Sequence, residues 1–167
     1  ENIELPPYDR DELVGNLLNM KRNNPIVKSI SRLKRTDVVG SGIKPQPATA
    51  DEGFNERILE IWNEWAEAPE ITGMMNMKSV QQEIVDAPLF FGDIGLLYGS
   101  NGLLQLFEGS NIGSPMGVGG FNEDDPDKNG VIVDDYGKPV EYQVGRRVNG
   151  TLMDVHNVPA RDFLLYM

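Results

Sequence analysis

Cysteine is absent from the 167 residues, and histidine occurs once, at His156. Without cysteine there is no disulfide framework and no thiolate metal site, and a lone histidine offers little for acid–base catalysis. No apolar run approaches the roughly 18 residues of a membrane helix, and neither a basic-then-apolar leader nor a Gly-rich phosphate loop is visible. We therefore expect no catalytic residues, no cofactor and no membrane contact.

Basic residues are also few, and they are unevenly placed. Asp and Glu number 26 against 15 Lys and Arg, so the net charge is −11. This balance argues against broad wrapping of nucleic acid, because phosphate contacts require cations. Residues 13–36 nevertheless contain no acid and six cations: Lys21, Arg22, Lys28, Arg32, Lys34 and Arg35. Two interpretations stay open, a solvated helix face or a surface that meets an anionic partner or the acidic face of a like subunit.

Four helices are predicted in the first half of the chain. Apolar spacing and capping residues favour helices over about residues 9–22, 25–35, 52–67 and 77–86. Asn24 and Pro25 have the character of an N-cap and a first helical residue, and Pro88 is expected to follow the end of the fourth helix. A short strand is predicted over residues 38–43, before a Pro-rich linker over residues 44–50.

The third predicted helix carries an apolar stripe that includes both tryptophans. The residues that recur on this face are Phe54, Ile58, Ile61, Trp62 and Trp65. We interpret Trp62 and Trp65 as core or interface anchors, with stacking on a sugar or base as the less favoured alternative. With Lys28, Arg32 and Arg35, they are the candidate contacts with another subunit or partner.

Beyond Pro88 the residue types favour strands and turns. Strands are expected over about residues 89–98, 103–108, 131–133, 140–144, 147–155 and 163–167. Tight turns are expected at residues 99–102, 135–137 and 149–150, and a long mobile loop over residues 109–130. Helices followed by antiparallel strands predict an α+β fold, with N-terminal helices packed on a mainly antiparallel β-sheet. The expected division is a helical subdomain over residues 1–88 and a β subdomain over residues 89–167.

One acidic loop resembles part of a calcium site. Asp125, Asp127 and Asn129 offer oxygen atoms at alternate positions of an EF-type loop, and Gly130 permits the bend. The closing Glu is missing, because its position is occupied by Tyr136. We assign no metal here. A calcium-stabilised binding module that uses the 125–129 loop is kept as the alternative function, against a polar loop that simply turns into a strand.

Several segments match, in order, the motifs of a known family. They are R-N-N-P at 22–25, V-V-G-S-G-I-K-P-Q at 38–46, W-x-x-W-A at 62–66, G-D at 92–93, L-Q-L-F-E-G-S-N at 104–111, G-x-x-x-D-x-x-G-K-P-V-x-Y at 130–142 and V-P-A-R-D at 158–162. Each piece alone is unspecific, but their number and order make the sequence resemble the lambda-family portal proteins of tailed phages over about residues 10–167. The chain has Leu165 where that family usually has a histidine.

This resemblance implies a structural protein rather than an enzyme. Such subunits form a ring, usually of twelve, at one capsid vertex. The ring nucleates head assembly, docks the terminase, lets DNA pass for packaging and ejection, and joins the head–tail connector. The implied partners are copies of the chain itself and a capsid or scaffold protein, in a virion assembled in the bacterial host cytoplasm.

The family's stem, clip and tunnel segments have no counterpart in this sequence. The first residue is Glu1 rather than Met. We therefore expect an N-terminal wing fragment that is, by itself, a monomer or a weak dimer.

Overall fold

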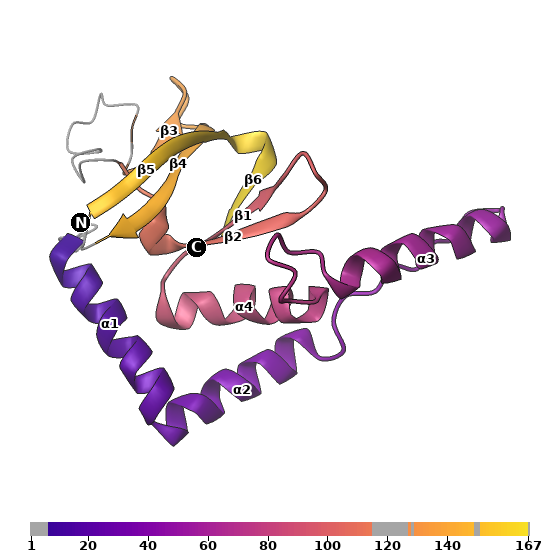
Figure 1. Ribbon diagram of the computed structural model, residues 1–167, viewed down its shortest axis with the longest axis horizontal. Helices are drawn as coiled ribbons and strands as arrows, with labels where there is room; N and C mark the ends of the chain where they lie inside the picture. Colours follow the sequence, from indigo (N-terminus) through magenta and orange to yellow (C-terminus); the bar gives the residue numbers. More distant parts are fainter. Residues whose placement is uncertain (1–6, 115–126, 128, 149–150, 167) are drawn as a thin grey trace.

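Helices occupy the N-terminal half and strands the C-terminal half, so the predicted α+β class is confirmed (Figure 1). The computed structural model describes residues 7–114, 127, 129–148 and 151–166. None of the helices in these ranges is long and apolar enough to cross a bilayer. The division into subdomains at residue 88 stays a prediction.

The four helices agree well with the sequence. They are α1 (Pro7–Asn23), α2 (Pro25–Val39), α3 (Glu52–Glu67) and α4 (Met77–Phe90). The side chain of Asn24 accepts hydrogen bonds from the amides of Ile26 and Val27, and Pro25 opens the helix where its missing amide hydrogen costs nothing. The side chain of Asp51 caps α3 by accepting from the amide of Phe54.

Two predicted boundaries are wrong. Residues 38–43 do not form a strand, because α2 continues through Val39 and ends only at Gly40, which has φ +54°. The β-branched valines favoured a strand locally, but α2 is already held on α4 by its preceding turns. The second error concerns Pro88, which lies inside α4 rather than beyond its end. Residues 89 and 90 are therefore helical, and the extra turn buries Phe90.

The strands form two three-stranded antiparallel sheets. One sheet has the order β2-β1-β6, and the other has the order β3-β4-β5. Their strands are β1 (Ile94–Tyr98), β2 (Leu104–Glu108), β3 (Val131–Val133), β4 (Pro139–Val148), β5 (Thr151–Pro159) and β6 (Phe163–Tyr166). Residues 109–111 and 160–162 are single 3₁₀ turns. The expected turn at residues 149–150 and most of the expected 109–130 loop lie outside the described residues.

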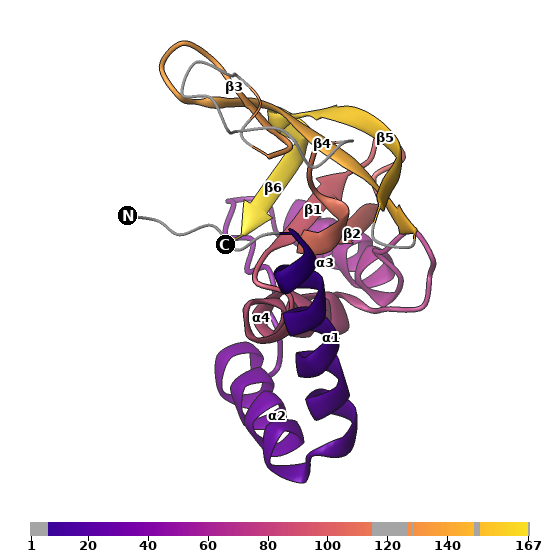
Figure 2. The same ribbon diagram turned by 90° about the vertical axis from the view of Figure 1, so that its left-hand side faces the viewer.

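The main hydrophobic core lies between the two sheets. Its buried members are Phe107, Ile112, Tyr142, Val144, Val158 and Phe163. The rings of Tyr142 and Phe163 have centroids 4.8 Å apart, which joins β4 of one sheet to β6 of the other. Figures 1 and 2 show α4 beneath this pair of sheets and α2 on the far side of α4.

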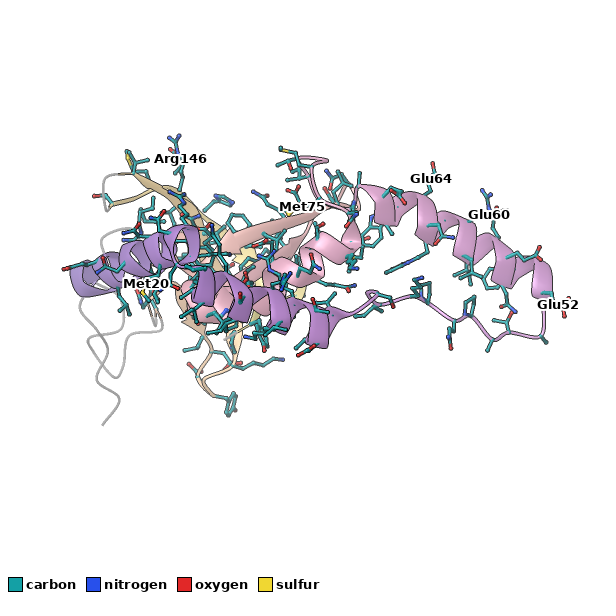
Figure 3. All side chains as sticks on the ribbon, turned by 90° about the horizontal axis from the view of Figure 1, so that it is seen from below. Met20, Glu52, Glu60, Glu64, Met75 and Arg146 are labelled. Atoms are coloured by element: carbon teal, nitrogen blue, oxygen red, sulfur yellow. The ribbon has the colours of Figure 1, made fainter. Side chains whose placement is uncertain are left out.

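Helix α3 projects from the rest of the molecule (Figure 1). None of its residues is buried. Its C-terminal end is held on the first sheet, where the indole Nε1 of Trp65 donates to the carbonyl of Gly102 at 2.9 Å and the amide of Leu104 donates to the carbonyl of Pro69 at 2.7 Å. The linker before α3 runs back alongside it (Figure 3). The rest of the helix therefore presents most of its surface to solvent.

Candidate interaction surfaces

A buried ionic cluster ties α1 and α2 to α4. Asp86 is fully buried in α4, and its carboxylate accepts from Arg35 Nη2 at 2.6 Å and from Ser31 Oγ at 2.8 Å. Lys21 Nζ lies 2.9 Å from the same carboxylate and 4.4 Å from the ring centre of Phe90. Burial alone would raise the pKa of Asp86, but the hydrogen bonds from Arg35, Lys21 and Ser31 outweigh it and hold that pKa below its ordinary value.

Arg35 is bound on two sides within the chain. Besides Asp86, it contacts Glu83 Oε1 at 2.9 Å. Burial opposes the charged guanidinium, but the hydrogen bond to Asp86 and the charge of Glu83 overcome this and raise the pKa of Arg35 above its ordinary value. The structure therefore gives this candidate contact residue a role inside the fold.

Lys28 and Arg32 are different, because both are exposed on α2. They border a pocket of about 450 Å³ whose other lining residues include Lys21, Arg35 and Thr36. Neither Lys28 nor Arg32 forms an ion pair within the part of the chain that the structure describes. Of the basic candidates, these two remain available to a partner.

The outward side of α2 also carries an unpaired apolar stripe. Ile26, Ile30 and Leu33 follow one another at helical spacing on the side opposite Ser31, and they are 69%, 52% and 55% exposed. Lys28 and Arg32 do not border this stripe, because they lie toward the Ser31 side of the helix, where both line the pocket described above. We call Ile26, Ile30 and Leu33 the apolar face of α2.

Helix α3 presents a second apolar stripe with acidic residues beside it. Phe54 and Ile61 are 55% and 53% exposed, and Ile58 between them is half-buried. Glu64 lies one turn after Ile61, and Glu60 points, like Glu64, away from the linker (Figure 3). We call these five residues the acidic-apolar face of α3. Three further acids lie on this helix, at Glu52, Glu56 and Glu67.

The two tryptophans lie next to each other near the C-terminal end of α3. Their ring centroids are 5.3 Å apart, and both side chains are half-buried. Trp65 is an anchor within the chain, through its hydrogen bond to Gly102. Trp62 borders a pocket of about 200 Å³ formed with residues that include Ile43 and Lys44. A contact of either ring with another protein stays a prediction.

The acidic loop is only partly described. Asp125 lies outside the described residues. The carboxylate of Asp127 accepts from Ser114 Oγ at 2.7 Å and from the amide of Gly130 at 2.6 Å, and Asn129 adopts φ +55°. Among the residues that the structure describes, no group of three or more His, Asp or Glu could hold a metal ion. The geometry seen at Asp127 is that of a turn leading into β3.

The signature block over residues 130–142 builds a hairpin. Asp134 Oδ1 accepts from the amides of Tyr136 and Lys138, both at 2.9 Å, and so closes the turn between β3 and β4. A Cβ on Gly130 would lie 2.4 Å from the Cα of Gly113, so only glycine fits there. The residues of this motif therefore stabilise the hairpin, and their spacing is explained by the fold.

Sequence reasoning missed Asp86, the centre of the ionic cluster. A signal was present, since Asp86 is a single acid after the apolar pair Ile84 and Val85 and before Ala87. An acid in such a run is expected to be buried with a partner. Its partners, however, lie 51 and 65 residues earlier in the chain, at Arg35 and Lys21.

The residues of the 130–142 motif build a hairpin, and helices α2 and α3 each expose an apolar stripe. Exposed apolar stripes are typical of a protein that assembles with others. The chain matches the model of the family described as phage portal protein, lambda family, over residues 4–167. It belongs to this family. No match was found among curated proteins. The resemblance seen in the motifs is thereby confirmed, and a general role as a phage portal protein and virion component follows.

Proposed function

We propose that this chain forms the outer wing of a portal subunit, and that copies of the subunit assemble into a ring at one vertex of the capsid. The ring, of about twelve copies as is usual in the family, passes DNA during packaging and ejection and joins the head to the tail connector. Terminase and a capsid or scaffold protein are its further partners, and assembly takes place in the bacterial host cytoplasm. The chain itself carries out no chemical step in these events.

The observation that carries this proposal is the family match over residues 4–167. The exposed faces of α2 and α3 support it. Apolar stripes on the surface of a single chain are typical of a surface that another protein covers. The internal roles of Arg35 and Trp65 leave Lys28, Arg32 and Trp62 as the candidate contact residues that are not already explained by the fold.

The proposal is tested by expressing the entire reading frame that encodes this chain and examining the purified product by negative-stain electron microscopy. Annular particles with a central opening are expected. A product that stays monomeric at all concentrations would contradict the proposal. Residues 1–167 alone are expected to give a monomer or a weak dimer in light scattering, which separates ring assembly from association of this part by itself.

A further inference from the structure

We propose that the basic pocket between α1, α2 and α4 binds phosphate groups, supplied either by a free phosphate compound or by the backbone of a nucleic acid. These three helices contact one another (Figure 2). The pocket has a volume of about 450 Å³, which is enough for a small ligand. Its lining residues are Lys21, Lys28, Ser31, Arg32, Arg35, Thr36 and Gln82. The site lies within one chain, so the inference does not depend on assembly of the ring.

The charge of this pocket is opposite to that of the chain. Its lining contains four cations and no acid, although the chain has 26 acidic and 15 basic residues. Within the described residues, the acids that pair with these cations are Asp86 and Glu83. Two acids against four cations leave two positive charges uncompensated. A pocket lined by charge of one sign concentrates ligands of the opposite sign.

Three of the four cations lie on one side of α2. Lys28, Arg32 and Arg35 follow one another at intervals of four and three residues, which places them on successive turns of the same side. The one acid of α2, Asp37, lies on the opposite side, with the apolar face. The arrangement of α2 therefore gathers its unpaired positive charge at the pocket and keeps its negative charge away from it.

Two of the cations are held in place by Asp86 before any ligand binds. Lys21 Nζ and Arg35 Nη2 contact the same oxygen of Asp86, at 2.9 Å and 2.6 Å. Fixing these long side chains in advance lowers the entropy that binding would otherwise cost. Nη2 of Arg35 also carries the contact with Glu83, so its Nη1 has no hydrogen bond within the part of the chain that the structure describes. Donors of both fixed and free cations thus remain for a ligand.

The donor set favours a phosphate over a carboxylate. Lys21 comes from α1, Gln82 from α4 and the remaining lining residues from α2, so donors approach from three helices. A phosphate group offers three acceptor oxygens and up to two negative charges, whereas a carboxylate offers two oxygens in one plane and one charge. Arginine binds such oxygens in pairs, and lysine adds a point charge. The two uncompensated charges match a terminal phosphate or two adjacent phosphodiesters.

Titration with inorganic pyrophosphate tests the site. The product of the entire reading frame, in phosphate-free buffer at low salt, is titrated by isothermal calorimetry, and saturable binding at one site per chain is expected. Lys28→Gln with Arg32→Gln should weaken this binding about tenfold, because charge-assisted hydrogen bonds are lost. Both residues are exposed and unpaired within the described ranges, so the thermal melt of this variant should be unchanged.

The matched control is Lys44→Gln with Arg161→Gln. It removes the same charge from exposed residues that do not line the pocket, and it should change the affinity less than about twofold. An equal loss in the two double variants would reduce the binding to the general charge of the chain and overturn the inference. Annular particles that bind no pyrophosphate would also overturn it, while the proposed function would stand.

A short double-stranded oligonucleotide separates the two sources of phosphate. Displacement of pyrophosphate by this DNA assigns the phosphate to a nucleic acid. The slope of log affinity against log salt concentration should then be smaller by about 2 in Lys28→Gln with Arg32→Gln, because two phosphate contacts no longer release counterions. Pyrophosphate binding with which DNA does not compete assigns the pocket to a free phosphate compound. Either result supports a phosphate site.

An oligoglutamate peptide is the contrasting ligand. It should bind more weakly than pyrophosphate, because each carboxylate offers fewer acceptor oxygens and less charge. Peptide binding that is at least as tight as pyrophosphate binding, and is lost in Lys28→Gln with Arg32→Gln, would assign the pocket to an acidic segment of a protein. That result would overturn the phosphate site.

Discussion

The guanidinium of Arg35 donates to the carboxylate of Asp86 at 2.6 Å, in a contact where Asp86 has no exposed surface at all. The pair joins α2 to α4 and lies next to Lys21 and Ser31. Arg35, which the sequence places among five other cations in a basic stretch, is thus engaged within the fold although a quarter of its side chain is exposed. Surface charge on α2 is carried instead by its neighbours along the helix.

Asp86→Asn is expected to lower the free energy of unfolding at pH 7 by about 3 kcal/mol. The reason is that removing one member of a buried ionic cluster leaves the remaining charges without compensation. Denaturant titration followed by circular dichroism measures the change. Glu56→Gln, on the exposed side of α3, is the control and should change the stability by less than about 0.5 kcal/mol. A variant as stable as the unsubstituted chain would show that the cluster contributes nothing net.

The stability of the unsubstituted chain and that of Asp86→Asn should respond differently to acid. The pKa of Asp86 in the folded chain is below its ordinary value of 3.8. Its contribution to stability is therefore present above about pH 4 and is lost as the pH falls through the folded-state pKa. The stability gap between the unsubstituted chain and Asp86→Asn should narrow progressively below pH 4. Chemical denaturation at a series of pH values checks this, and a gap that widened in acid would contradict it.

Gly95→Ala and Gly15→Ala should have opposite effects. A Cβ on Gly95 would lie 2.1 Å from Cζ of Phe163, whose ring is buried and packed against Tyr142, so the substitution should cost about 1–3 kcal/mol. Gly15 lies within α1 with nothing near its added Cβ, so alanine there should stabilise the chain by about 0.5–1 kcal/mol. Thermal melts of the two variants measure both signs. Equal effects would show that the approach of Phe163 to β1 is not tight.

How far the sequence predicts this fold depends on whether the decisive contacts are local. The bounds of α3 could be predicted because its cap, Asp51, and its apolar spacing lie within the helix itself. The end of α4 could not, because Pro88 is a local stop signal that is overridden by burial of Phe90 in the tertiary structure. The strand predicted over residues 38–43 was wrong for a similar reason. Val38 and Val39 prefer strands locally, but this preference is weaker than the packing that continues α2 through them.

For the candidate contact residues, too, the decisive contacts are not local in the sequence. Lys28 and Arg32 are exposed, but the apolar stripe of α2 is exposed as well, although the amphipathic pattern of the sequence would place it against the core. The internal role of Arg35 depends on Asp86, which lies 51 residues later, and that of Trp65 depends on Gly102, which lies 37 residues later. Periodicity cannot identify partners that only the fold brings together.

Calcium and EDTA should leave the thermal stability of the chain unchanged. Both carboxylate oxygens of Asp127 already accept hydrogen bonds, from Ser114 and from the amide of Gly130. A calcium ion would have to replace these contacts before it gained a ligand. A melt in EDTA, repeated with excess calcium, provides the measurement. A specific site would add about 2.7 kcal/mol with ligand at a hundredfold over its dissociation constant, and a shift of that size would favour the calcium-stabilised alternative.

Asp134→Ala tests whether the family signature is structural. One oxygen of Asp134 accepts from the amides of Tyr136 and Lys138, so alanine leaves two turn amides without their acceptor. Each lost hydrogen bond costs about 0.5–1.5 kcal/mol, which predicts a loss of about 1–3 kcal/mol. Denaturant unfolding of this variant should be compared with that of Asp135→Ala, whose exposed side chain lies in the same turn and should change the stability by less than about 0.5 kcal/mol. Similar losses in the two variants would mean that the turn does not depend on the Asp134 carboxylate. A large loss for Asp134→Ala alone would explain the aspartate of the signature by its role in the hairpin, without any role in contacting a partner.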